Sequence, residues 1–288
     1  MSATSLTWGG RSIPGPGGLP AVAVSLTGPS LAQARTQARS AVVAGADVLE
    51  LRVDLLEEAG ALAAPDPLDV ATAAAQVLEC LRGLGEAIAA DGADAGAPVL
   101  LTCRTTAEGG RAQLDDASYG ALLRSVLDGL TDWAPERRPA AIDVEVQRGC
   151  LPQVCEQAHG LGIDVVASFH DFETTPADEV LEEVLARMAR EGADLAKIAV
   201  WPTSAQDVAR LLGVCARATA DAGERSGLGV PVAAMSMGAL GAVSRVAPAF
   251  GSALTFAVVP DEQGQARASA PGQLPIQDVR RCLELLQV

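Results

Sequence analysis

The sequence has very little lysine, histidine or aromatic residue. Its 288 residues contain 21 lysines and arginines together, of which one is lysine, and two histidines. Aromatic residues make up 3% of the chain, so small aliphatic side chains must fill most of the core. The 36 acidic residues give a formal net charge of −15, the wrong sign for binding to nucleic acid or to an acidic membrane surface.

Motifs for membranes, disulfides, metals and nucleotides are also missing. No apolar run reaches the ~18 residues that a membrane span needs, and the N-terminus has no signal-peptide pattern. The six cysteines form no Cys-x-x-Cys pair and the two histidines are far apart, so we expect no metal and no disulfide framework. Neither glycine-rich nucleotide motif is present. We therefore expect a cytoplasmic protein without a cofactor.

Short runs rich in β-branched residues alternate with longer helical segments, as in repeated βα units. Eight such runs within about 250 residues favour a (β/α)8 barrel over an open doubly wound sheet. We expect one domain over residues 1–288, in which residues 1–20 form either a hairpin over one barrel mouth or a loose tail. The predicted strands are Ala21–Leu26, Val48–Val53, Val99–Arg104, Ala141–Val146, Asp164–Ser168, Leu195–Val200, Val232–Ser236 and Ala253–Val259; helices include Leu31–Val43, Leu68–Ala90, Ala177–Arg190 and Ala205–Ala222.

Several predicted strands contain charged residues, which a plain barrel core would exclude. Because side chains alternate along a strand, Glu50, Arg52 and Asp54 share one side of theirs, and Asp143 and Glu145 share one side of theirs. If these sides face the barrel axis, acids and bases converge at its C-terminal mouth.

Lys197 is the strongest single candidate for chemistry, since it is the only lysine and lies in the middle of a predicted strand. The amine of a lysine can attack a carbonyl as a nucleophile, which the guanidinium of an arginine cannot do. The apolar neighbours of Lys197 would lower the pKa of the amine and leave more of it neutral. The competing interpretation is a lysine whose head reaches the surface.

Four further residues stand at strand ends or in the loops that follow. His170 suits proton transfer near neutral pH, although a structural histidine fits equally well. Glu108 could orient an imidazole and Arg104 could bind a hydroxyl or carboxylate, unless the two form a salt bridge at the rim. Arg245 could bind a carboxylate through both of its outer nitrogens.

Together these segments resemble type I 3-dehydroquinate dehydratase, the Schiff-base family of the shikimate pathway. The resemblance runs in order from about Ala21 to Gln273. It is carried by Glu50-Leu-Arg-Val-Asp54, Thr102-Cys-Arg-Thr-Thr-Ala-Glu-Gly-Gly110, Ser168-Phe-His-Asp-Phe172, Lys197-Ile-Ala-Val200, Met235-Ser-Met237, Ser244-Arg245, Phe250-Gly-Ser252 and Ala268-Ser-Ala-Pro-Gly-Gln273.

The resemblance implies a (β/α)8 barrel that converts 3-dehydroquinate to 3-dehydroshikimate without metal or cofactor, and a homodimer. It implies that Lys197 forms the Schiff base, that His170 is the general acid and base, and that Glu108 orients the imidazole. Arg245 would hold the substrate carboxylate. Residues implied to contact the hydroxyls are Glu50, Arg52 and Arg104; Ser269 and Gln273 belong to a loop over the site, and Ser25, Met235, Met237 and Phe256 line the pocket.

Two other functions compete with this interpretation. A class I aldolase would share the barrel and the lysine, but it would need a phosphate-binding loop after the seventh and eighth strands. A barrel that only binds a metabolite or a protein would not need Lys197, His170 and Glu108 together. One departure from the family pattern is the long stretch 257–267, which we expect to affect closure of the loop over the site.

Overall fold

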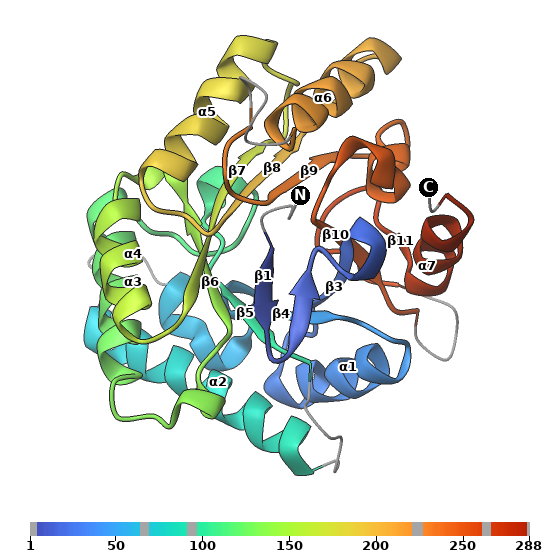
Figure 1. Cartoon of the computed structure of the whole chain (residues 1–288). Coiled ribbons are helices and arrows are strands. Elements are labelled where there is room, and N and C mark those ends of the chain that lie inside the picture. Colours follow the sequence, from blue (N-terminus) through green and yellow to red (C-terminus); the bar gives the residue numbers. More distant parts are fainter. Residues whose placement is uncertain (1–4, 64–68, 91–96, 221–226, 261–265, 287–288) are drawn as a thin grey trace.

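The computed structural model describes residues 5–63, 69–90, 97–220, 227–260 and 266–286. Nine strands form one curled parallel sheet in the order β11-β10-β3-β4-β5-β6-β7-β8-β9, and helices surround it (Figure 1). The strands are β3 (Ala21–Leu26), β4 (Val48–Arg52), β5 (Val99–Thr102), β6 (Ala141–Glu145), β7 (Asp164–Asp171), β8 (Leu195–Val200), β9 (Val232–Ser236), β10 (Leu254–Val258) and β11 (Leu274–Pro275). All eight predicted strands are present.

The helices follow the strands and pack on the outer face of the sheet (Figure 1). Polar residues fix where several of them begin: Ser30 accepts a hydrogen bond from the backbone of Gln33, and Ser204 and Asp207 form a reciprocal capping box. The helices are α1 (Leu31–Val43), α2 (Val70–Ala90), α3 (Asp116–Gly129), α4 (Leu151–Gly160), α5 (Asp178–Arg190), α6 (Ala205–Ala218) and α7 (Ile276–Leu285).

Two strand ends differ from the prediction by more than one residue. β7 continues three residues past Ser168, because His170 and Asp171 pair with Ala199 and Val200 of β8. β5 ends at Thr102, two residues early, since the chain turns there into a loop. Both differences place charged side chains at the same mouth of the barrel.

The strands alternate between two apolar layers, as a sheet buried on both faces must. Outward side chains such as Val22, Leu49 and Ile142 pack with the helices in the larger core cluster. Inward side chains at the strand starts, such as Val48 and Leu100, form a second cluster inside the barrel. Further along each strand the inward residues become polar, so the interior is apolar at the N-terminal end and charged at the C-terminal end.

The barrel closes between β9 and β10 through a seam that relies partly on a side chain. The backbone N–H of Ala253 donates to the carbonyl of Val232 at 2.7 Å. The hydroxyl of Ser252 accepts from the backbone N–H of Ala234 and donates to the carbonyl of Leu254. The predicted barrel is therefore confirmed, with Ser252 bridging its last two strands.

The N-terminal segment is a hairpin, one of the two predicted alternatives. Strands β1 (Leu6–Trp8) and β2 (Arg11–Ile13) pair antiparallel and lie across the front of the barrel in Figure 1. Trp8 and Ile13 are fully buried in the interior cluster, and the indole N–H of Trp8 donates to Asp164 at 2.8 Å. The hairpin thus plugs the apolar N-terminal mouth.

Replacing Trp8 by alanine should destabilise the fold without changing the chemistry of the site. Removing a buried indole typically lowers the free energy of unfolding by about 3–5 kcal/mol. Urea denaturation of the variant and the wild type would measure this loss. Trp8→Phe, which keeps a ring but loses the bond to Asp164, should cost less. A Trp8→Ala loss below about 1 kcal/mol would show that the hairpin is only a loose cover.

Candidate active site

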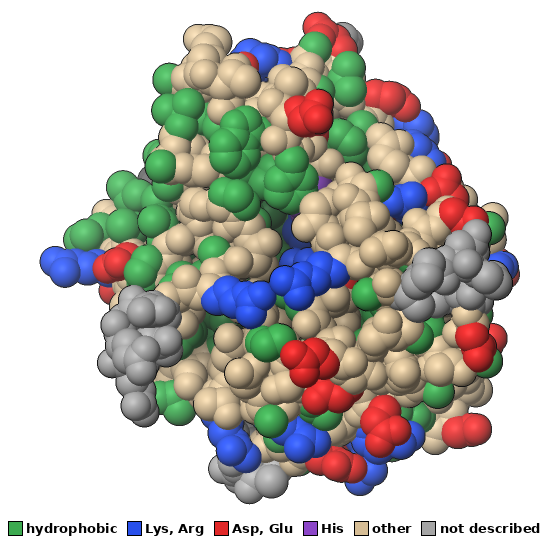
Figure 2. Space-filling model, turned by 180° about the vertical axis from the view of Figure 1, so that it is seen from behind, with side chains coloured by type: hydrophobic (Ala, Val, Ile, Leu, Met, Phe, Trp, Pro, Cys, Tyr) green, Lys and Arg blue, Asp and Glu red, His purple; other side chains and the backbone are tan. Residues whose placement is uncertain are grey.

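A small cavity of about 40 Å³ lies at the C-terminal ends of the barrel strands. Figure 2 looks onto this end, where basic side chains border a hollow. Strands from around the barrel and the loop after β10 all contribute to the lining. It consists of Glu50, Arg52, Arg104, Glu108, Gly109, His170, Phe172, Lys197, Ala199, Met235, Arg245, Phe256, Ser269, Ala270 and Gln273.

Most of the residues selected from the sequence meet in this cavity. Ser25 contacts it indirectly, because its hydroxyl donates to Glu50 and accepts from Ser269. Met237 does not line the cavity; it is fully buried in the interior cluster together with Met235.

Lys197 projects from the middle of β8 into the barrel and is 4% exposed. Its Nζ lies 3.3 Å from Asp143 Oδ2, 3.8 Å from Glu50 Oε1 and 4.6 Å from the ring centre of Phe256. The apolar setting predicted from neighbouring sequence is therefore incomplete. Two carboxylates, from β4 and β6, face the amine.

His170 and Glu108 form a pair across the mouth. The ring Nδ1 of His170 lies 2.8 Å from Glu108 Oε2. Burial lowers the pKa of His170 well below its usual 6.5, and the charges of Arg104 and Lys197 lower it further. The imidazole is therefore neutral at pH 7, which suits a general base.

Burial also raises the pKa of Glu108 to about 8, against the lowering effect of Arg104. This proton decides which nitrogen of His170 is free. When Glu108 is ionised it accepts the Nδ1–H and leaves Nε2 with its lone pair toward the cavity; when protonated, it donates to Nδ1 and leaves a hydrogen on Nε2. The second oxygen of Glu108 is buried without a partner among the described residues.

Arg104 connects the two halves of the site. One guanidinium nitrogen lies 2.8 Å from Asp143, and another lies 3.4 Å from Glu108 and 3.2 Å from Glu145. Arg104 also donates to the hydroxyl of Ser168 at 2.9 Å. Because Asp143 also contacts Lys197, a single guanidinium positions the partners of both the amine and the imidazole. The salt bridge between Arg104 and Glu108, which was the alternative expected at the rim, exists, but it is buried and part of this network.

The loop after β5 needs glycine to hold Glu108 in place. The backbone N–H of Gly110 donates to the carbonyl of Thr105 at 2.8 Å. A Cβ on Gly110 would lie 2.1 Å from the carbonyl oxygen of Arg104, so any side chain there would push the loop off the strand.

Asp54 holds Arg52, a role that was not predicted from the sequence. Its carboxylate accepts two bonds from Arg52, both at 2.8 Å, and the backbone N–H groups of Arg104 and Arg111. It thereby joins the end of β4 to the loop that carries Glu108. The bidentate pair also fixes the orientation of the guanidinium of Arg52.

Arg245 is almost fully buried and incompletely paired. One nitrogen donates to the backbone carbonyl of Pro271 at 3.1 Å, and Nε has no partner among the described residues. Burial lowers its pKa to about 10. A buried cation with an unused donor favours an anionic ligand beside it.

The loop that carries Ser269 and Gln273 lies over the cavity. The side chain of Gln273 accepts from the backbone N–H of Ser269 and donates to its hydroxyl, which reaches Ser25. The backbone N–H of Gly238 donates to the carbonyl of Pro271. Residues 261–265 of the long stretch before this loop lie outside the described residues.

A larger hollow of about 790 Å³ occurs at the opposite end of the barrel, between the hairpin, α2 and the segment 135–140. It contains none of the residues selected from the sequence. No group of three potential metal ligands occurs among the described residues. None of the helices in the described ranges is long and apolar enough to cross a bilayer.

Comparison with known proteins points to one family. The sequence profile described as type I 3-dehydroquinase matches residues 22–288. The 3-dehydroquinate dehydratase of Klebsiella pneumoniae is 36% identical over 269 residues, which are 92% of each chain, and that of Methanosarcina barkeri is 36% identical over 252 residues, or 86% of this chain and 89% of the other.

Solved structures agree with the sequence matches. The 3-dehydroquinate dehydratase of Geobacillus kaustophilus superposes with a TM-score of 0.80 at 29% identity, covering 99% of this chain and 97% of the other. The type I enzyme of Clostridium difficile, solved with covalently modified comenic acid, gives 0.78 at 28% identity and covers 98% and 97%.

Proposed function

Because the chain belongs to the type I 3-dehydroquinase family, it is a hydro-lyase that dehydrates 3-dehydroquinate, and we propose that Lys197, His170 and Glu108 carry out the reaction. Schiff-base chemistry is characteristic of this type. The observation that supports the assignment most directly is that the only lysine of the chain is buried in the same cavity as the imidazole of His170.

Lys197 forms the Schiff base in this proposal. Its amine must lose a proton before it attacks the substrate ketone, and Asp143 and Glu50 are the nearest acceptors. Addition gives a carbinolamine, and loss of water from it gives an iminium. The iminium then accepts the electron pair that remains when the neighbouring carbon loses its proton, so a neutral enamine replaces a carbanion.

His170 moves the protons. With Glu108 ionised, Nε2 removes the proton next to the iminium carbon; the resulting imidazolium then protonates the leaving hydroxyl as the enamine expels it. Water then hydrolyses the product iminium, which releases the enone and frees the amine of Lys197. Because β7 pairs His170 with Ala199, the imidazole stands one inward step nearer the mouth than Lys197. This offset matches a base that acts on the ring carbon beside the imine.

The remaining side chains bind and enclose the substrate. The unused donor of Arg245 takes the substrate carboxylate, while Glu50, Arg52 and Arg104 contact the hydroxyls. Ser25, Met235 and Phe256 contribute to the pocket, with Met237 supporting Met235 from the interior. A cavity of about 40 Å³ holds little more than ordered water, so the loop with Ser269 and Gln273 opens to admit the substrate.

The proposed steps use only side chains of this chain and need no metal or cofactor. The whole chain acts as one domain, because the hairpin packs into the interior of the barrel. A cytoplasmic location fits the six cysteines, which are all unpaired thiols. From the family resemblance we also propose that the protein forms a homodimer, which light scattering would test. Family membership favours neither of the two competing functions.

Replacing Lys197 should abolish the dehydration while leaving the barrel folded. Both Lys197→Ala and Lys197→Arg should lose at least ~10³ of kcat, because arginine keeps the charge but cannot form the imine. The measurement is ultraviolet absorption of the conjugated enone product. Near-normal turnover by Lys197→Arg would reject the nucleophile assignment and leave only an electrostatic role.

The rate should rise with pH as Glu108 loses its proton. We expect kcat/KM of the wild type to show an ascending limb with a midpoint near pH 8, since protonated Glu108 occupies Nδ1 of His170 and leaves a hydrogen on Nε2 in place of the lone pair that must remove the proton. Glu108→Gln should lose this limb and lower the plateau by about tenfold, as orienting partners commonly do. An unchanged limb in the variant would mean that another group controls the base.

A further inference from the structure

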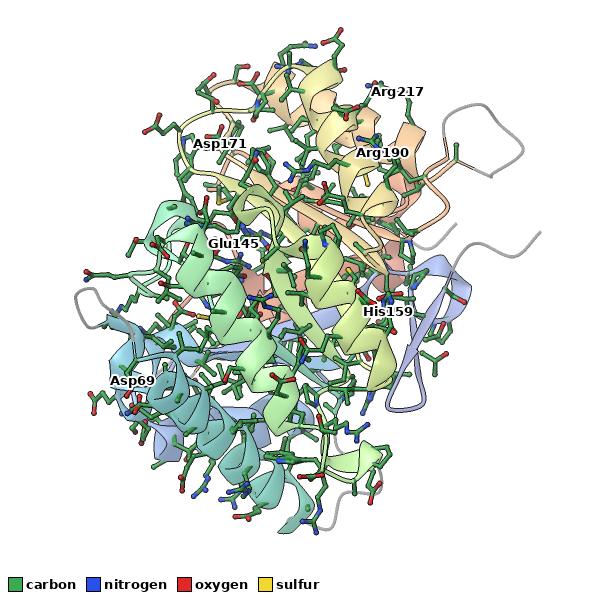
Figure 3. All side chains as sticks on the ribbon, turned by 90° about the vertical axis from the view of Figure 1, so that its left-hand side faces the viewer. Asp69, Glu145, His159, Asp171, Arg190 and Arg217 are labelled. Carbon is green, nitrogen blue, oxygen red and sulfur yellow. The ribbon has the colours of Figure 1, made fainter. Side chains whose placement is uncertain are left out.

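Arg148 lies behind the site, outside the cavity, in a one-turn 3₁₀ segment (Val146–Arg148) that follows β6. Three residues per turn bring Arg148 back over Glu145, and Gly149 then ends the turn with a positive φ of 69°. Figure 3 shows Glu145 at the end of the barrel that also carries Asp171, away from His159. The side chain of Arg148 is 12% exposed.

Arg148 makes three polar contacts at once. It donates to Asp116 at the start of α3 (2.7 Å), to Glu145 (3.0 Å) and to the hydroxyl of Thr105. Thr105 in turn donates to both oxygens of Glu145, from its backbone N–H and its hydroxyl, at 2.8 and 2.7 Å. Arg148 is therefore fixed in place by partners from a helix, a strand and a loop.

These contacts extend a chain of alternating charges from the surface to the reacting groups. Asp116 is exposed, whereas Glu145 is completely buried and lies between Arg148 on one side and Arg104 on the other. Arg104 is in turn shared with Asp143 and Glu108. Neither Arg148 nor Glu145 reaches the cavity, so the binding of substrate does not explain them.

The balance of charge along this row of side chains determines where Arg104 points. Glu145 now divides its attraction between two guanidinium groups. Without Arg148, the full charge of Glu145 would act on Arg104 and draw it away from Asp143 and Glu108. A buried carboxylate that loses one of its cations also repels the nearest carboxylates more strongly.

We propose that Arg148 is a positioning residue for the reaction, which through Glu145 keeps Arg104 on Asp143 and Glu108 and so favours the ionised form of Glu108 beneath His170. This inference rests on the proposed function of the Glu108–His170 pair. The charged groups that act on Glu108 are Arg104 beside its own loop, Asp143 and Glu145 from β6, and Lys197 from β8. The titratable imidazole of His170, from β7, contacts it directly.

The test is the pH profile of kcat/KM for Arg148→Met. Loss of the cation should move the midpoint of the ascending limb to higher pH by about half a unit. The reason is that the unbalanced charge of Glu145 acts on Glu108 across several ångströms of protein interior. A half-unit shift lowers kcat/KM about threefold below pH 7, and the values approach those of the wild type above about pH 10. Arg148→Lys should give an intermediate limb.

Arg124→Met is the matched control. Arg124 lies in the same surface hollow as Arg148 and Asp116, but its side chain donates only to the backbone carbonyl of Gly120 among the described residues. This variant removes the same charge from the same face and should leave the limb in place. A shift as large as that of Arg148→Met would show that net charge, not the chain through Glu145, controls Glu108.

Asp116→Asn keeps the test decisive if Arg148→Met does not fold. Asp116 is exposed at the helix start, where Asp115 provides the cap, so its loss leaves the fold intact. Freed from one acceptor, Arg148 should bind Glu145 more strongly and move the limb by about 0.2 units to lower pH. A shift to higher pH contradicts the proposal.

The possible failures are distinguishable. If the Glu108→Gln variant still shows the ascending limb of kcat/KM, the proposed role of Glu108 is wrong, and so is the inference about Arg148. If Glu108→Gln removes the limb but Arg148→Met does not move it, only the inference about Arg148 is wrong. An equal loss of kcat/KM at every pH in Arg148→Met would likewise assign Arg148 a purely structural role.

Discussion

The site depends on a guanidinium buried among carboxylates. Arg104 has three acidic neighbours, and each leads to a different group: Asp143 to the amine of Lys197, Glu108 to the imidazole of His170, and Glu145 to Arg148. Charges out of reach of water are costly unless they are paired with good geometry. The pairing therefore restricts each side chain to nearly one arrangement, and this arrangement brings a nucleophile and a base to one small cavity.

The barrel keeps the buried charges of the site away from the apolar packing that stabilises the fold. Inward side chains are apolar where the strands begin and charged where they end, and the hairpin adds Trp8 and Ile13 to the apolar end. Stability and chemistry thus occupy opposite ends of the same strands, as is general for this architecture.

The sequence predicted the strands, because β-branched runs and alternation are local signals, and it predicted Lys197 because the residue is unique. It could not predict what surrounds the amine. Asp143 and Glu50 come from strands 54 and 147 residues away and meet Lys197 only after the sheet curls closed. For the same reason, an apolar neighbourhood in sequence became a pair of carboxylates in space. The link from Arg148 to Thr105 also needs tertiary structure, whereas the spacing of Glu145 and Arg148 was a signal available in the sequence.

The most direct measurement is mass spectrometry of the protein treated with borohydride during turnover of 3-dehydroquinate. Reduction of an imine adds a stable mass to one residue, and we expect a single adduct on the peptide that contains Lys197, absent from protein treated without substrate. An unmodified chain that still turns over the substrate, or an adduct at the N-terminal amine, would contradict the claim that the buried amine performs the chemistry.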